Sequence, residues 1–224
     1  MTTLHTLRVF LGPGGDGGNP LGVVLDGAAV PAAERQAIAA ELSYSETVFV
    51  DDAATGALRI YTPAVELPLA GHPLVGTSWL LAHSGAPVAT LRPPAGEVPT
   101  WWAGGLTWIR ARLEWATLYD VAQLESPADV DAMSVPGGDA MVAVWAWEDE
   151  ARGRVRARVF PNGIGIAEDE ATGAAALQLG ALIGRDIVIR QGAGSELHVR
   201  PADDGRVAVG GRVALVERRA APAA

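Results

Sequence analysis

The 224-residue chain is 49% apolar and 19% charged, which predicts a folded protein with a substantial core. Its formal net charge of −9 argues against nucleic acid or an anionic membrane surface as a partner. All 17 basic residues are arginines and cysteine is absent, which excludes lysine Schiff bases, thiolate nucleophiles, disulfides and cysteine-ligated metals. Because no apolar run reaches the roughly 18–20 residues of a membrane helix and no signal-peptide pattern is present, we expect a cytoplasmic protein.

The first half of the chain is predicted to alternate strands with two helices. Apolar runs between turn signals predict strands at residues 5–10, 23–27, 46–50 and 57–63. The glycine-rich residues 12–22 are expected to form a loop. A helix is predicted at residues 31–42, with Pro31 at a permitted first-turn position, and an apolar helix from about residue 73 to residue 83.

The second half is also predicted to be rich in strands. These are expected at residues 105–121, 139–150, 154–163, 185–192, 195–201 and 205–219. Residues 126–133 predict a short helix, because Ser126 suits the capping position and Pro127 the first helical position. The segment 168–173 leads into a further, apolar helix that runs to residue 183.

Two of these helices are apolar on nearly all sides. Between residues 73 and 82 only a Thr–Ser pair is polar, and between residues 174 and 183 only Gln178 is. Such helices must be buried all around, and each follows a strand and a glycine-containing loop. This loose repeat predicts an α+β fold of two similar lobes, each a curved mixed sheet rolled around one central helix. Residues 1–104 would form the N-terminal lobe and 105–224 the C-terminal lobe, with the last strand packing back on the first.

The loops before the two apolar helices carry titratable side chains beside glycines. A helix N-terminus has free N–H groups and about half a positive charge, and Gly71 and Gly173 would let a ligand approach them. Two such ends facing each other across a cleft would bind a small carboxylate. His72 and Asp169 lie in these loops, and Glu46 would join them if it lines the same cleft. Two carboxylates and an imidazole suffice for proton transfer without metal or cofactor, and burial would raise the pKa of Glu46.

The same residues also have simpler interpretations. Strand alternation equally allows Glu46 to face solvent. A histidine at a helix start often serves as a cap or a hydrogen-bonding group, and Asp169 can be a turn or capping residue. The glycine-rich residues 12–22 resemble a phosphate loop, but no lysine follows and the spacing does not fit.

Five segments, taken in order, resemble the phenazine biosynthesis PhzF-like family. "GNPLGVVLDG" (18–27) is similar to its GNPAGVVL opening, and "AAELSYSETVFV" (39–50) to its A-E-x-x-x-SETAFV segment. "RIYTPAVELPLAGHPLVGT" (59–77) is similar to R-x-F-TP-x-x-E-x-P-x-CGHAT-x-G, and "VFPNGIGIAEDEATGAAA" (159–176) to F-x-P-x-x-G-x-x-EDPATGSA. "GRVAVGGRVALV" (205–216) resembles the closing strands. Each motif is only moderately specific, but the ordered set spans both halves; residues about 86–158 carry no motif that we identify.

The resemblance implies a fold similar to diaminopimelate epimerase, a homodimer, a small-molecule substrate, and an isomerase that needs no metal or cofactor. The characterised activity of the family's namesake is the isomerisation of trans-2,3-dihydro-3-hydroxyanthranilate, a proton shift. The general acid/base of that pattern corresponds to Glu46, and its His and Asp correspond to His72 and Asp169. The residues then expected to help hold the substrate are Asn19, Ser45, Gly71, Thr172 and Gly173.

Departures from the family pattern leave more than one function open. Ala70 stands where the family has a cysteine, which also removes the two-cysteine racemase mechanism of the wider superfamily. Glu170 replaces a proline, and Ala174 replaces a serine whose hydroxyl could bond substrate. We predict a proton-shifting isomerase that acts through Glu46 on a small cyclic carboxylate. The alternative is an inactive homologue that binds a small acid, and a third hypothesis is a structural dimer without ligand, with Glu46 in open solvent.

Overall fold

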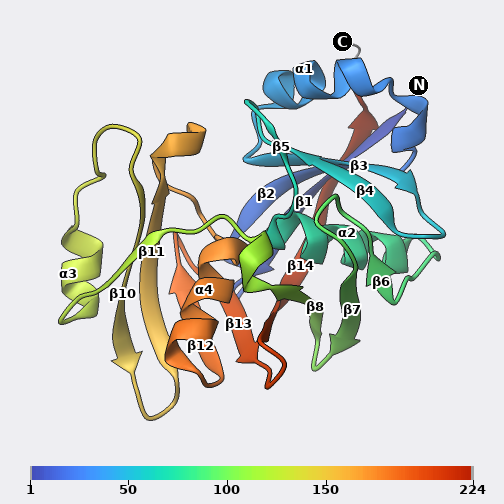
Figure 1. Ribbon diagram of the computed structural model, residues 1–224. Helices are drawn as coiled ribbons and strands as arrows, with labels where there is room; N and C mark the ends of the chain where they lie inside the picture. The colour runs from blue at the N-terminus through green and yellow to red at the C-terminus, as the bar shows by residue number, and fades with distance from the viewer. Residues whose placement is uncertain (1, 223–224) are drawn as a thin grey trace.

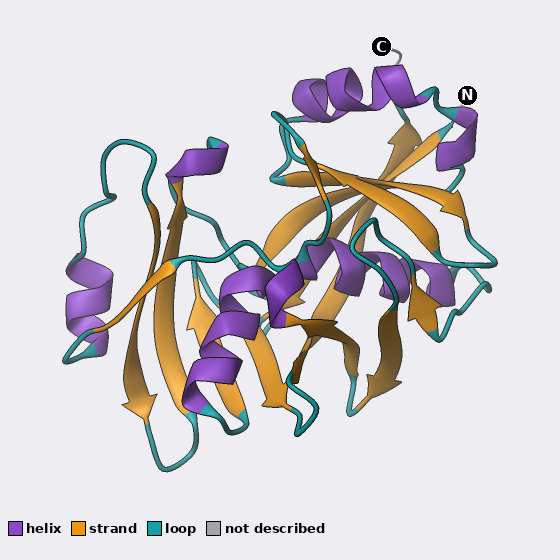
Figure 2. Cartoon of the chain, viewed as in Figure 1, coloured by secondary structure: helices purple, strands orange, loops and turns teal. Residues whose placement is uncertain are grey.

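Strands dominate the part of the chain that the computed structural model describes, residues 2–222 (Figures 1 and 2). The first eight strands are β1 (Thr3–Leu11), β2 (Gly17–Val24), β3 (Glu46–Asp52), β4 (Ala57–Tyr61), β5 (Glu66–Leu67), β6 (Thr90–Leu91), β7 (Val98–Ala103) and β8 (Leu106–Arg112). The others are β9 (Asp120–Gln123), β10 (Met141–Asp149), β11 (Arg154–Pro161), β12 (Ile187–Gln191), β13 (Ser195–Pro201) and β14 (Arg206–Ala220). The α-helices are α1 (Ala32–Leu42), α2 (Gly71–His83), α3 (Pro127–Ala132) and α4 (Gly173–Ile183).

The last strand, β14, joins the two halves of the sheet. The strand order is β5-β4-β3-β2-β1-β14-β13-β12-β11-β10-β9, and β8 also pairs with β14. The beginning of β14 pairs with β8 and β13, and its end pairs with β1. At the crossing, a Cβ on Gly210 would lie 2.4 Å from the Trp108 ring, and one on Gly211 would lie 2.4 Å from the Phe10 ring. Two glycines therefore let this strand pass between two large aromatic side chains.

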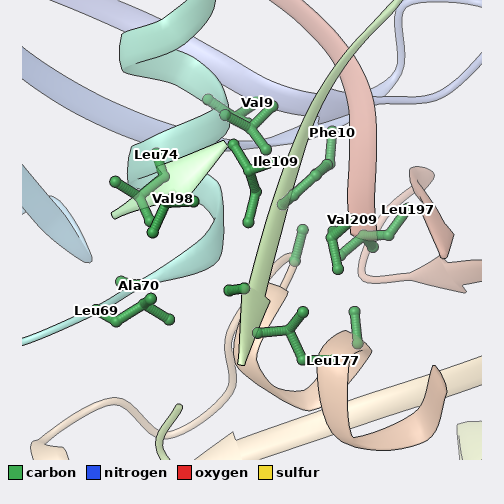
Figure 3. Packing of buried hydrophobic residues seen from close by; sticks show 14 of the residues in the cluster. Val9, Phe10, Leu69, Ala70, Leu74, Val98, Ile109, Leu177, Leu197 and Val209 are labelled. Atoms are coloured by element: carbon green, nitrogen blue, oxygen red, sulfur yellow. The ribbon is translucent and has the colours of Figure 1, made fainter. Parts of the chain in front are cut away.

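The two apolar helices lie inside the curved strands. Helix α2 contacts β1, β2, β3, β8 and β14, and α4 contacts β13 and β14. Figure 3 shows Leu74 of α2 and Leu177 of α4 packed in one cluster with the strand residues Ile109 and Val209. The predicted burial holds for both helices except at their ends, where Ala82 of α2 is exposed and Leu182 of α4 is 62% exposed. The α+β class is confirmed and the packing is consistent with two lobes.

The division of the chain at residue 104 stays a prediction. Strands β7 and β8 pair with each other across that point, and both contact α2. The other two helices lie outside the sheets: α1 packs on Phe49 and Val24, and α3 packs on β10 and β11. Ser126 caps α3 as predicted, because its hydroxyl accepts a hydrogen bond from the Asp129 N–H at 3.3 Å.

Several boundaries differ from the sequence predictions. The glycine-rich loop ends at Asp16, because residues from Gly17 onward pair antiparallel with β1. Helix α2 begins at Gly71 rather than near residue 73, so the Gly-His pair forms its first turn. The strand predicted at 105–121 stops at Arg112, where a 3-10 turn (Leu113–Trp115) leaves β14 and packs on α4. Among residues 2–222, none of the helices has the length and apolar character needed to cross a membrane.

Candidate active site

Glu46 begins β3 and lies on the face of the sheet that packs on α2. Val48 and Val50 share this face by strand alternation and belong to the main core, whereas Phe49 packs under α1 on the other face. Glu46 is 8% exposed, so the interpretation that it faces solvent is wrong. Burial, and after it the nearby Asp169 carboxylate, raises the pKa of Glu46 from 4.5 to about 8, opposed by the Ser45 hydroxyl.

His72 faces Glu46 from the first turn of α2. Its Nε2 lies 3.3 Å from the Glu46 Oε2, and the ring is buried. Neither atom meets hydrogen-bond geometry with any residue in the described range 2–222. Burial lowers the pKa of His72 from 6.5 to about 3, opposed by a bond to the Pro20 backbone. At neutral pH the pair is therefore a neutral imidazole facing a carboxylic acid, rather than a salt bridge.

Asp169 is held by hydrogen bonds just before α4. The Asn19 Nδ2 donates to its Oδ1 at 2.7 Å, and the Thr172 hydroxyl donates to its Oδ2 at 2.7 Å. Burial raises the pKa of Asp169 from 3.8 to about 6, and these two donors oppose the rise. Since like charges repel, ionisation of Asp169 makes ionisation of Glu46 harder.

Asn19 and Ser45 support Asp169 from the other half of the chain. Asn19 is 2% exposed and also donates to the Ala171 carbonyl at 2.9 Å. The Ser45 hydroxyl donates to the Asn19 Oδ1 at 2.9 Å. These bonds connect β2 and β3 to the loop before α4. Both side chains lie behind Asp169 rather than in the lining of the cavity, so their contact with a substrate stays a prediction.

The N-termini of α2 and α4 meet at two glycines. A Cβ on Gly71 would lie 2.6 Å from the Gly173 Cα, so no larger residue fits at either position without a shift. The predicted facing of the two helix ends is thus present. Beside them is a cavity of about 20 Å³, room for about one water. It is lined by Glu46, His72, Asp169, Gly71, Thr172, Gly173, Ala174, Tyr119, Thr117, Pro161 and the apolar residues Leu67, Leu69, Ala70, Ile164 and Ile166.

The buried position of Glu46 bears on the third hypothesis. A structural dimer without ligand predicted Glu46 in open solvent, and this expectation is wrong. The residues expected to do chemistry, Glu46, His72 and Asp169, all line one cavity. Their chemical roles are untested by this geometry and are taken up below as a proposal.

Sequence reasoning missed several supporting residues of the site. Gln191 donates from Nε2 to the Asp169 carbonyl and to the Thr172 hydroxyl, each at 2.9 Å. Glu170 stands where the family pattern has a proline. Its carboxylate accepts a hydrogen bond from the Ser195 hydroxyl at 2.7 Å. Gln191 and Ser195 belong to β12 and β13 and follow no motif, so only the folded backbone brings them to the loop. Tyr119 was missed for the same reason.

Comparison with known proteins begins with the sequence. The model of the phenazine biosynthesis-like protein family matches residues 14–114, so the family signal extends past residue 86, where we identified no motif. A trans-2,3-dihydro-3-hydroxyanthranilate isomerase from Pseudomonas fluorescens is 46% identical over 71 residues, 30% of this chain and 26% of that protein. The matched segments span less than a third of the length of the curated relatives, 30% and 26% for the first two.

Solved structures extend the likeness to both halves of the chain. A phenazine biosynthesis protein of the PhzF family from Bacillus anthracis superposes with a TM-score of 0.79 at 20% identity, over 97% of this chain and 98% of that chain. A protein from Pseudomonas aeruginosa described as a predicted epimerase has a TM-score of 0.75 at 26% identity, over 98% of each chain. These structures confirm the fold, and the family model shows that residues 14–114 are similar to phenazine biosynthesis-like proteins.

Proposed function

We propose that the protein is a cofactor-free isomerase that shifts a proton within a small cyclic carboxylate through Glu46. One observation carries the proposal: a buried carboxyl lies 3.3 Å from a neutral imidazole, in a cavity between two helix N-termini. A pKa of about 8 leaves Glu46 able to lose and regain a proton near neutral pH. About a tenth of the Glu46 side chains are ionised at pH 7 with that pKa.

The proposed reaction leaves the atoms of the substrate unchanged in number. Ionised Glu46 takes a proton from a carbon beside an activating group, and the resulting acid returns it to another carbon of the same molecule. Neutral His72 can accept a hydrogen bond from the acid form and so orient the proton. The N–H groups at Gly71 and Gly173 suit the substrate carboxylate, while Asp169 accepts a hydrogen bond from a substrate donor.

The name of the Pseudomonas fluorescens relative supplies the first compound to test, trans-2,3-dihydro-3-hydroxyanthranilate. It carries the ring and the carboxylate that the proposal requires. A cavity of about 20 Å³ is too small for a six-membered ring, so the proposal requires the cavity to widen when substrate binds. The homodimer expected from the family is likewise a proposal, and sedimentation of the purified chain tests it.

The decisive experiment compares the unchanged chain with Glu46→Gln. Turnover of the dihydro compound in heavy water is followed by NMR, which reports both product and deuterium incorporation. The rate of the unchanged chain should rise with pH and level off above about 8, as Glu46 ionises. Glu46→Gln should lower it by about 10²–10⁴-fold, while Glu41→Gln, on the exposed side of α1, should leave it unchanged. Near-native turnover by Glu46→Gln would show that the assignment is wrong.

Ala174 favours a second candidate, a homologue that binds a small acid without converting it. Its methyl group lines the cavity at the start of α4, where the family has a serine hydroxyl. This candidate predicts calorimetric binding of the dihydro compound with neither product nor deuterium incorporation at any pH. Turnover by the unchanged chain excludes it.

A further inference from the structure

Tyr119 brings a phenol into the cavity from a part of the chain without a family motif. It follows the family-model match, which ends at residue 114, and lies in the irregular segment before β9. The residue is 6% exposed, lines the cavity, and packs in one cluster with Ala174 and Ala175 at the start of α4. A side chain remote in sequence is thus placed beside one of the two helix ends.

The backbone of Tyr119 is fixed by Gln178. The Gln178 Nε2 donates to the Tyr119 carbonyl at 2.9 Å, and the Tyr119 N–H donates to the Gln178 Oε1 at 3.0 Å. Gln178 is the polar residue within the otherwise apolar stretch 174–183 of α4. A polar group in a buried helix needs a partner, and here it satisfies both backbone groups of one cavity residue.

The Tyr119 hydroxyl takes part in none of the hydrogen bonds found within residues 2–222. The side-chain partner of Tyr119 in this range is Gln178, which bonds to the Tyr119 backbone. The Thr172 hydroxyl, in contrast, donates to Asp169 and accepts from Gln191. Because Tyr119 is 6% exposed and lines the cavity, its hydroxyl is available to a polar group of a ligand bound there. Burial, followed by the charges of Asp169 and Glu46, raises the pKa of Tyr119, which keeps the phenol neutral and able to donate.

We propose that Tyr119 contacts the substrate by donating a hydrogen bond to the carboxylate bound at the start of α4, and that Gln178 is its positioning residue. Three observations support this: Tyr119 is buried in the lining of the cavity, it packs beside Ala174, and Gln178 makes paired bonds to its backbone. This inference rests on the proposed function in one respect, because both place the substrate in the same cavity. It narrows the substrates to those with an acceptor oxygen on the side of α4.

The test measures binding, so it does not depend on turnover. The probe is 3-hydroxyanthranilate, an aromatic relative of the dihydro compound, titrated into the full chain in a calorimeter. Tyr119→Phe should weaken its affinity about tenfold, the effect of losing one hydrogen bond to a charged group. Tyr61→Phe is the matched control, because Tyr61 is also buried but packs on Phe49 under α1. The Tyr61→Phe variant should bind the probe with native affinity.

A double-mutant cycle tests the positioning role. Gln178→Leu should weaken the binding of the probe about as much as Tyr119→Phe does. In the double variant, Gln178→Leu should change the affinity of Tyr119→Phe by less than twofold. Gln178→Glu keeps an acceptor for the Tyr119 N–H and replaces the donor nitrogen with a second oxygen, so it supplies the same test if the leucine variant does not fold. A purely structural role would instead weaken binding equally in both backgrounds and would overturn the assignment of Gln178.

Two results would overturn the assignment of Tyr119. One is native affinity in Tyr119→Phe, and the other is the absence of probe binding by the unchanged chain. Neither depends on Glu46→Gln, whose turnover decides the proposed function separately. Native probe affinity in Tyr119→Phe together with lost turnover in Glu46→Gln would support the proposed isomerase function and contradict only the proposed contact of Tyr119 with the substrate.

Discussion

Replacing Glu46 with glutamine should stabilise the protein more as the pH rises. The pKa of Glu46 in the folded protein, about 8, lies above its ordinary value of 4.5. The stability that comes from keeping this group protonated is therefore complete below pH 4.5 and is lost as the pH rises through about 8. Each pH unit in that window costs the folded state about 1.4 kcal/mol. Because the side chain is only 10% exposed, solvent screening reduces this little.

Glutamine has nearly the shape of protonated glutamate and does not titrate. Glu46→Gln should thus match the unchanged chain at pH 4 and exceed its free energy of unfolding by on the order of 4 kcal/mol at pH 8.5. Urea unfolding at both pH values measures the difference, and the slope of each transition checks that the unfolded states are comparable. Glu41→Gln, at an exposed site on α1, is the control and should show no such dependence. A difference between Glu46→Gln and the unchanged chain that is constant with pH would refute the reasoning.

Two further predictions concern contacts between the halves of the chain. Gly173→Ala should lower the free energy of unfolding by about 1–3 kcal/mol, since its Cβ would lie 2.6 Å from the Gly71 Cα. Gly137→Ala is the control, because the space around Gly137 is open. Equal thermal midpoints for the two variants would contradict the close approach of Gly71 and Gly173. Asn19→Ala should cost about 2–3 kcal/mol and further raise the pKa of Asp169, since it removes donors at 2.7 and 2.9 Å. Urea unfolding and carboxyl NMR titration measure these effects, and an unchanged Asp169 titration would refute the second.

The strands and the two central helices could be predicted because their signals are local. The apolar stretches that became α2 and α4 can be buried only inside a curved sheet, so their lack of polar residues predicted the arrangement. The strand at 105–121 was predicted too long because alternation does not show where a strand leaves its neighbour. Here it leaves β14 after Arg112, and the turn at 113–115 packs on α4, a tertiary contact without a local signal.

The residues of the candidate site likewise fall into those with a local sequence signal and those without one. Glu46, His72 and Asp169 belong to recognisable motifs, so the sequence alone predicts that they share one cavity, as they do. The groups that hold and complete the site act through bonds between distant segments, such as Gln178 with Tyr119, 59 residues apart. No periodicity or spacing encodes such a pair. Gln178 is nevertheless recognisable in the sequence as a polar residue in an apolar helix, and its partner Tyr119 lines the cavity.

The position of Glu46 in an apolar strand follows from its protonation. An ionised carboxylate in this setting would need a cation, but the nearest candidate, His72, is itself kept neutral by burial, with a pKa of about 3. The neutral imidazole and the acid therefore face each other without forming a salt bridge, and the fold tolerates Glu46 as an acid. Ionisation becomes easier when a ligand brings donors or positive charge into the cavity, because these favour the carboxylate. A substrate carboxylate brings negative charge and acts in the opposite direction, so the pKa of Glu46 in the complex depends on the balance between that charge and the donors of the substrate. A pH profile at saturating substrate measures this pKa: a plateau that begins below pH 8 indicates that the donors dominate, and one that begins above pH 8 indicates that the carboxylate does.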